Sequence, residues 1–292
     1  MTNLENLALM NAAGMVKRIG DVHPLLRSPV THVVLGTITV EERLGNPEPN
    51  FWVSPDGTHA LNSRGLPGPG STYYVEHGKT IADTVHNAGK MLVTSITSTQ
   101  SSNDWRILAG VAAGIGSDVI EINISCPNKW KNGRNETVVA HDPGAVRNIV
   151  SLVGDAAPTT VLWVKLPPYR FRDEGVCEKI LECLGESEQV GAVVSANTIG
   201  GCTPPMVDGK PVISMPTAGM SGPKMRAWSL SQIHMLRRHS TLPIIGVGGV
   251  NSGEALVQYQ KADVTGVQVG THFFLNGARV FSEILTEAAY LQ

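Results

Sequence analysis

The segment from Asn123 to Asn128 gathers several chemically active side chains within a few residues. Its sequence, Asn-Ile-Ser-Cys-Pro-Asn, directly follows the apolar run Val119–Ile122, which is typical of a buried strand. Polar groups at the end of such a strand are costly to bury unless something bonds to them. In barrels of alternating strands and helices, the carboxyl ends of the strands hold the active site. The segment therefore indicates an enzyme, with Cys126 as a reactive group.

Lys165 is a second candidate for a functional residue, because it interrupts an otherwise apolar strand, Val161–Leu166. A lysine inside a buried strand needs a partner or a route to water. In one interpretation its amine reaches solvent at the end of the strand. In the other it is a fixed positive charge beside an electron-accepting ring, where it would stabilise negative charge that develops on reduction.

Glycines follow the last two strands that we predict, in the pairs Gly248-Gly249 and Gly270-Thr271. Glycine lets backbone N–H groups approach an anion closely, and barrels often bind phosphate at this place. Ordinary tight turns would also explain either pair alone. Together the pairs indicate a phosphate site, which the segment Gly219–Gly222 could close.

The four cysteines are Cys126, Cys177, Cys183 and Cys202, and no two of them have C-x-x-C spacing. The nine histidines form no H-E-x-x-H pattern. We therefore expect no metal site. Only Cys126 stands among polar neighbours in a turn, and we interpret the other three as structural and reduced.

Eight apolar, β-prone runs are spaced along the chain, and most are unbroken rather than alternating, which is typical of parallel strands covered on both faces. They are Leu7–Ala12, Thr31–Leu35, Met91–Ile96, Asp118–Asn123, Val161–Leu166, Gly191–Ala196, Pro243–Val247 and Thr265–Val269. Segments between them have helical spacing, for example Tyr73–Asn87, Asp104–Gly114, Pro143–Gly154, Trp228–His239, Gly253–Gln260 and Ala278–Tyr290. Asp142-Pro143 and Asn251-Ser252 have the pattern of capped helix starts.

This alternation predicts the α/β class and a (β/α)8 TIM barrel, with residues 1–292 as one domain. A doubly wound open sheet is the alternative, but no G-x-G-x-x-G opens a helix after an early strand. Two irregular stretches, Gly45–Gly70 and Lys129–His141, follow strands. We expect them to be elaborated loops over the C-terminal face of the barrel.

Composition narrows the classes of function. The formal net charge is −2 without long runs of one sign, which gives no support for nucleic-acid or membrane-surface binding. No apolar stretch is long enough to span a membrane, and the N-terminus lacks the pattern of a secretory signal. We therefore expect a cytoplasmic protein.

These motifs together resemble the dihydroorotate dehydrogenase family, whose fold is an FMN-binding (β/α)8 barrel. The resemblance extends from Asn11 to Phe274. It is carried by Gly45-Asn46-Pro47, Leu61–Pro67, Asn123–Asn128, Lys165–Pro168, Asn197–Gly200, Gly248-Gly249 and Gly270-Thr271. It implies FMN-dependent oxidation of (S)-dihydroorotate to orotate in de novo pyrimidine biosynthesis.

The resemblance also implies roles for individual residues. Cys126 would take a proton from C5 of dihydroorotate, and Lys165 would contact the flavin near N1. The substrate would be held by Lys17, Asn62, Gly65, Leu66, Asn123, Asn128, Asn197 and Thr198. The cofactor would be bound by Ala13, Gly14, Lys17, Thr37, Asn123, Lys165, Ala196, Ser221, Gly222, Gly248, Gly249, Gly270 and Thr271.

A cysteine base is similar to soluble class 1, and the string Lys165–Tyr169 is closest to its single-subunit, fumarate-using class 1A branch. The membrane-associated class 2 uses serine and adds an N-terminal extension, for which we expect no room here. One feature is nevertheless like class 2: soluble members place a lysine just after strand two, where this chain has Gly36-Thr37. We infer that Lys17 supplies that charge. Arg64 is a further departure, and it would either meet a ligand carboxylate or point to solvent.

Two rival functions stay open at this level. A related flavoenzyme could act on another dihydropyrimidine, although a neutral uracil would give Lys17 and Arg64 no carboxylate to bind. A barrel could also bind flavin without turnover, as a divergent paralogue. The sequence does not choose among fumarate, a quinone, or NAD through a partner subunit as electron acceptor, although the resemblance favours fumarate. A homodimer is expected by resemblance only.

Overall fold

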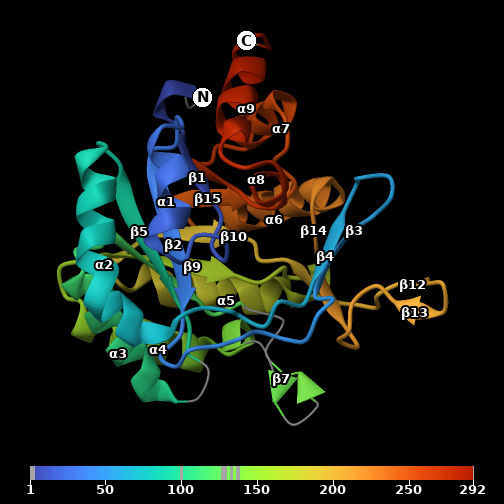
Figure 1. Ribbon diagram of the computed structural model, residues 1–292. Coiled ribbons are helices and arrows are strands. Elements are labelled where there is room, and N and C mark those ends of the chain that lie inside the picture. The colour runs from blue at the N-terminus through green and yellow to red at the C-terminus, as the bar shows by residue number, and fades with distance from the viewer. Residues whose placement is uncertain (1–3, 99–100, 126–129, 132–133, 136–138, 292) are drawn as a thin grey trace.

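Eight parallel strands close into a barrel in the computed structural model, which describes residues 4–98, 101–125, 130–131, 134–135 and 139–291 (Figure 1). Around the barrel the strand order is β1-β16-β15-β10-β9-β6-β5-β2. The strands are β1 (Ala8–Asn11), β2 (His32–Ile38), β5 (Met91–Ile96), β6 (Val119–Asn123), β9 (Val161–Leu166), β10 (Val190–Ser195), β15 (Ile244–Val247) and β16 (Gly266–Val269). All eight coincide with the predicted runs to within a few residues. The closed order confirms the TIM barrel and excludes the open sheet.

Helices surround the barrel and cover the outward faces of its strands (Figure 1). They are α1 (Ile19–Leu26), α2 (Gly70–Asn87), α3 (Ser102–Gly114), α4 (Pro143–Ala156), α5 (Glu174–Gly185), α6 (Arg226–His239), α7 (Gly253–Lys261), α8 (Thr271–Asn276) and α9 (Arg279–Ala289). Short 3-10 turns are η1 (Leu4–Asn6), η2 (Val139–His141), η3 (Phe171–Asp173) and η4 (Pro223–Met225). Both predicted caps are present: Asp142 accepts from the Ala145 N–H at 3.1 Å and Ser252 from the Ala255 N–H at 3.2 Å.

The barrel interior is a small apolar core, separate from the larger core between strands and helices. Its buried members are Met10, Ala12, Val34, Val93, Val119, Trp163, Ala192, Val194, Ile245 and Val247. Side chains alternate between the two faces of a strand. Glu121 and Asn123 therefore point inward like Val119, and Lys165 points inward like Trp163. The polar residues thus occupy the interior nearer the carboxyl ends of the strands.

A second, antiparallel sheet stands at the carboxyl end of the barrel. Its order is β11 (Ile199–Cys202), β14 (Ala218–Ser221), β4 (Ala60–Asn62) and β3 (Phe51–Val53). Strands β3 and β4 belong to the connection after β2, and strands β11 and β14 to the connection after β10, so this sheet lies over the barrel mouth. The expectation of elaborated loops is confirmed. The reading of Gly45–Gly70 as irregular is wrong, because β3 and β4 lie within it.

Two small hairpins complete the loop structure: β12 (Met206–Val207) with β13 (Lys210–Pro211), and β7 (Trp130–Lys131) with β8 (Arg134–Asn135). The β12–β13 hairpin projects away from the barrel at the right of Figure 1. Within the described ranges, no helix combines the length and apolar character needed to cross a bilayer.

Candidate active site

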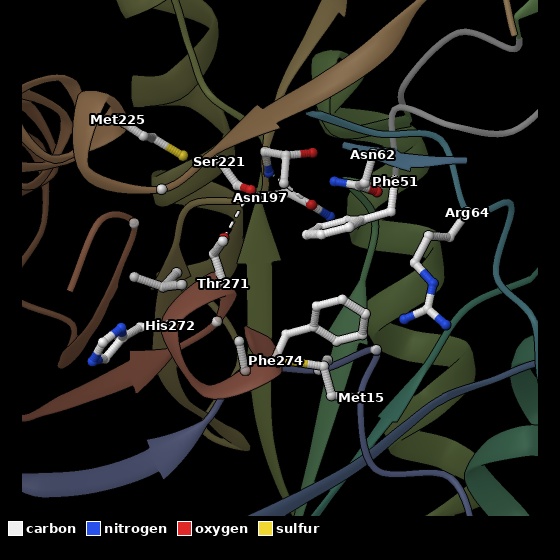
Figure 2. Close-up of a pocket in the computed structure, with 18 of the residues that line it drawn as sticks. Met15, Phe51, Asn62, Arg64, Asn197, Ser221, Met225, Thr271, His272 and Phe274 are labelled. Carbon is white, nitrogen blue, oxygen red and sulfur yellow. Dashed lines mark hydrogen bonds between the residues drawn. The ribbon is translucent and has the colours of Figure 1, made fainter. Parts of the chain in front are cut away.

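A cavity of about 270 Å3 opens at the carboxyl end of the barrel, beneath the antiparallel sheet (Figure 2). Every described residue that the resemblance assigned to substrate or cofactor lines it. These are Ala13, Gly14, Lys17, Thr37, Asn62, Gly65, Leu66, Asn123, Lys165, Ala196, Asn197, Thr198, Ser221, Gly222, Gly248, Gly249, Gly270 and Thr271. Cys126 and Asn128 lie outside the described residues. The fold therefore brings the ends of most barrel strands to one place.

Asn123 organises a cluster of polar side chains at the end of β6. It is 4% exposed, and its Nδ2 donates to Thr37 Oγ1 at 3.1 Å. Its Oδ1 accepts from Ser125 Oγ at 3.0 Å and from Asn197 Nδ2 at 3.4 Å. The orientation of this amide is thereby set, because donors face its oxygen and an acceptor faces its nitrogen. Asn123 also holds the amide of Asn197, which lines the cavity beside it.

Lys165 belongs to a buried polar network on the inner side of the cavity. Its ammonium donates to Gln268 Oε1 at 3.0 Å and lies 3.5 Å from Glu121 Oε1. The Gln268 amide in turn donates to Glu121 Oε2 at 2.7 Å. Lys165 is 5% exposed and lines the cavity. Of its two interpretations, the structure supports the fixed charge over an amine that extends into solvent.

Gly36, which lies within β2, leaves no room for the lysine that the family resemblance would place there. Its φ is +103°, and a Cβ added there would lie 2.4 Å from the carbonyl oxygen of Ser95. A side chain at this position would collide with backbone, so the strand end admits only glycine. The ammonium of Lys17 lies close by and donates to the carbonyl oxygen of Thr37 at 2.7 Å. The chain thus brings a cation to the end of β2 from the connection after β1.

A glycine cradle, formed by Gly222, Gly248, Gly249 and Gly270, also lines the cavity. A Cβ at Gly249 would lie 2.9 Å from the Gly222 carbonyl oxygen, so the two backbones approach as closely as glycine allows. Tyr259 donates to the Gly248 carbonyl at 2.6 Å. Thr271 donates to Ser221 across the cavity wall at 2.8 Å (Figure 2).

Aromatic side chains, which the sequence analysis did not single out, also line the cavity. The rings of Phe51 and Phe274 meet edge to face at 4.7 Å between centroids, and Figure 2 shows them next to one another. The Arg64 guanidinium lies 5.1 Å from the centre of the Phe274 ring, a cation–π contact. Arg64 therefore lines the cavity rather than extending freely into solvent. Burial lowers the pKa of His272, which also lines the cavity.

The three described cysteines do not compete with Cys126 for a chemical role. Cys177 and Cys183 are buried residues of α5, and burial raises the pKa of the Cys177 thiol to about 12. Cys202, on β11, is half-buried, and burial raises its pKa as well. Among the residues that the structure describes, no group of histidine, cysteine or acidic side chains is placed to hold a metal ion.

Comparison with known proteins identifies the family of this chain. The family model for dihydroorotate dehydrogenase matches residues 2–291. Dihydroorotate dehydrogenase B (NAD(+)), catalytic subunit, of Carboxydothermus hydrogenoformans is 31% identical over 89% of this chain and 80% of its own length. Dihydroorotate dehydrogenase A (fumarate) of Limosilactobacillus reuteri is 29% identical over 83% of this chain and 75% of its own length. With its barrel, its buried lysine and this match along nearly its whole length, the chain belongs to the dihydroorotate dehydrogenase family.

Proposed function

We propose that this protein is an FMN-dependent enzyme that oxidises (S)-dihydroorotate to orotate in de novo pyrimidine biosynthesis. Family membership implies a flavin, and FMN is the form that we propose. The observation that carries the proposal is that one cavity brings together groups that lie far apart in the sequence. It joins a buried lysine, the asparagines Asn62, Asn123 and Asn197, and the glycine cradle.

The residues present fit a phosphorylated flavin. The glycine cradle offers closely approaching backbone at the ends of β15 and β16, which suits a phosphate. Lys165 lies on the inner side of the same cavity, with its ammonium held by Gln268. A fixed positive charge there suits a ring that gains negative charge on reduction. Thr37 and Asn123 would complete the polar contacts of the ring.

The asparagine side chains of the cavity have the hydrogen-bonding groups that a pyrimidine ring needs. Asn62 and Asn197 line the cavity, and each amide offers both a donor and an acceptor, as the edge of orotate requires. Thr198 stands beside them, and the resemblance adds Asn128. The carboxylate of the ligand would bind near Gly65 and Leu66, with Lys17 supplying positive charge from the end of β2.

Oxidation of the C5–C6 bond removes a proton from C5 and a hydride from C6, and FMN, when bound, supplies the acceptor for the hydride. The thiolate of Cys126 would accept the C5 proton. The asparagines hold the pyrimidine flat so that both hydrogens leave in defined directions. Lys165 maintains positive charge on the inner side of the cavity while the electrons move.

The direct test is spectroscopic. The purified protein should be yellow, and anaerobic dihydroorotate should bleach it while dihydrouracil does not. Orotate should bind and uracil should bind far more weakly, because uracil lacks the carboxylate. A flavoprotein that dihydroorotate leaves oxidised would contradict the proposal and favour a non-catalytic paralogue. Preferential bleaching by dihydrouracil would favour the other dihydropyrimidine reaction.

Cys126→Ala tests the base. Flavin content should be retained, while the rate of anaerobic reduction by dihydroorotate should fall by about 10²–10⁴-fold, the usual value of a positioned proton acceptor. Cys202→Ala is the matched control, since it removes a half-buried thiol on β11 and should leave the rate unchanged. Fast reduction in Cys126→Ala would remove this thiol from the mechanism.

The electron acceptor that we propose is fumarate, and we expect a cytoplasmic homodimer. The support is the string Lys165–Tyr169, which resembles the fumarate-using branch. The relatives named above include a fumarate enzyme and the catalytic subunit of an NAD(+) enzyme. Steady-state turnover with fumarate, NAD(+) and a soluble quinone, each at saturating dihydroorotate, distinguishes these acceptors. Turnover with NAD(+) alone would contradict the choice of fumarate.

A further inference from the structure

Glu121 is a fully buried acid in the barrel interior that the proposed chemistry does not use. Its exposure is 0%, and one of its oxygens, Oε1, accepts no hydrogen bond among the described residues. That oxygen lies 3.5 Å from Lys165 Nζ, longer than a normal charge-assisted hydrogen bond. A buried ion pair held at this separation is costly and contributes little to folding. We therefore look for the role of the pair in its effect on the cavity.

Gln268 holds the two charges in this arrangement. Its Nε2 donates to Glu121 Oε2 at 2.7 Å, and its Oε1 accepts from Lys165 Nζ at 3.0 Å. A lysine only donates and a carboxylate only accepts, so the orientation of the amide between them is dictated. The three residues come from β6, β9 and β16, and all three are buried. The amide thus bridges the barrel and keeps the ammonium from closing onto the carboxylate.

The ammonium of Lys165 and the carboxylate of Glu121 lie at different depths from the cavity. Lys165 lines the cavity, whereas Glu121 and Gln268 do not. Glu121 also lies one inward-facing position below Asn123 on β6, further from the barrel mouth. The carboxylate therefore stands behind the ammonium as seen from the cavity. A negative charge in that place reduces the positive potential that the lysine projects into the cavity.

We propose that Glu121 and Gln268 are positioning residues that set the electron affinity of the bound flavin through Lys165. Glu121 weakens the positive field of Lys165, and Gln268 holds the separation at which that field is only partly cancelled. The inference rests on the proposed flavin site, but not on the identity of the substrate.

Glu121→Gln should raise the reduction potential of the flavin. The substitution keeps the shape of the side chain and removes its charge, so the field of Lys165 is no longer opposed. Sulfite, which adds reversibly to oxidised flavin and leaves negative charge on it, reports the same property by bleaching. Its affinity should increase by roughly tenfold or more. In a Lys165→Met background the same change should have little effect.

Gln268→Met should act in the opposite direction. Methionine has a similar length but cannot bridge the charges, so the ammonium should close onto the carboxylate and project a weaker field. Sulfite affinity and the reduction potential should both fall. This second variant keeps the test decisive if Glu121→Gln does not fold, because its effect should disappear in a Lys165→Met background, whereas the effect of a general loosening of the site would persist there.

Thr94→Val is the matched structural control. Thr94 is buried on β5 and pairs with Ser117 at 2.6 Å, but it faces the helices. The variant should lower the melting temperature and leave sulfite affinity unchanged. A yellow protein whose sulfite affinity is unmoved in Glu121→Gln, or in Gln268→Met if the first is unfolded, overturns the inference alone. Failure of dihydroorotate to bleach the flavin overturns the proposed function, while the sulfite shifts would still support the inference.

Discussion

At the scale of single residues, this site shows how a charge can be supplied from a different segment of the chain. Gly36 admits no side chain, because a Cβ there would meet the Ser95 backbone at 2.4 Å. Lys17 brings an ammonium to the same strand end and donates to the Thr37 carbonyl at 2.7 Å. If Lys17 contacts the ligand as we propose, the position of its charge matters to the ligand, and the segment that carries the lysine does not.

Lys17→Met should weaken orotate binding by about tenfold or more, since a hydrogen bond to a charged group is typically worth about 1.5–3 kcal/mol. The methionine keeps most of the apolar stem and removes only the ammonium. Titration of flavin absorbance with orotate measures the change. Lys79→Met, which removes an exposed lysine on α2, is the control and should have no effect. An unchanged orotate affinity in Lys17→Met would disprove the assignment.

At the scale of elements, the glycine cradle depends on three segments that meet. Gly248 and Gly249 follow β15, Gly270 follows β16, and Gly222 follows β14. Their close approach leaves no volume for a methyl group at Gly249, where φ is +70° and a Cβ would lie 2.8 Å from Arg226 Cβ. The spacing of these elements, rather than any one side chain, would make the anion site that we propose.

Gly249→Ala should therefore reduce flavin affinity by about tenfold or more, because the backbone must shift to relieve both the contact and the unfavourable φ. The flavin retained after dialysis, and its dissociation constant on adding FMN back, measure this effect. Gly89→Ala is the control, since Gly89 follows α2 with a φ of +69° and has nothing near its added Cβ. Comparable flavin loss in both variants would show that strain alone, and not the cradle, is responsible.

At the scale of the whole molecule, the opposite end of the barrel contributes a pH dependence. The imidazole of His32, on β2, stacks near Trp163 at 5.7 Å between ring centroids. Burial lowers the pKa of His32 from the usual value of 6.5, and Asp118 opposes this only in part. The unfolded chain then binds a proton that the folded protein resists. The contribution of the neutral imidazole to stability is therefore complete above pH 6.5. It is lost as the pH falls through 6.5 toward the lower pKa of the folded state.

The free energy of unfolding should accordingly fall when the pH is lowered from about 7.5 to about 5.5, and His32→Gln should reduce that dependence. Denaturant titrations at both pH values measure it. His234→Gln, at an exposed histidine on α6, should leave the slope as in the parent protein. A slope that His32→Gln does not change would assign the dependence to other groups, of which His272, with its lowered pKa, is the first candidate.

Local patterns determined the eight strands, the principal helices and both caps. Unbroken apolar runs, helical periodicity and a polar residue before a helix act through near neighbours, so they can be read along the chain. The polar residues after the strands could be assigned to one rim because parallel strands of a barrel point the same way. The described candidate residues that follow strands were expected at the cavity for that reason, and the others that line it were expected from the family resemblance.

Closure of the barrel decided the contacts between segments that are distant in sequence. Strands β3 and β4 are short and pair with each other, and β4 gains its second partner only where β14, distant in sequence, lies beside it. The contact of Phe51 with Phe274, and the bridge from Lys165 through Gln268 to Glu121, join residues from separate parts of the chain. No local periodicity encodes such contacts, because their energy depends on which surfaces the completed fold places together. The sequence alone therefore determined the barrel and the chemical groups at its rim, and only the tertiary structure decided their partners.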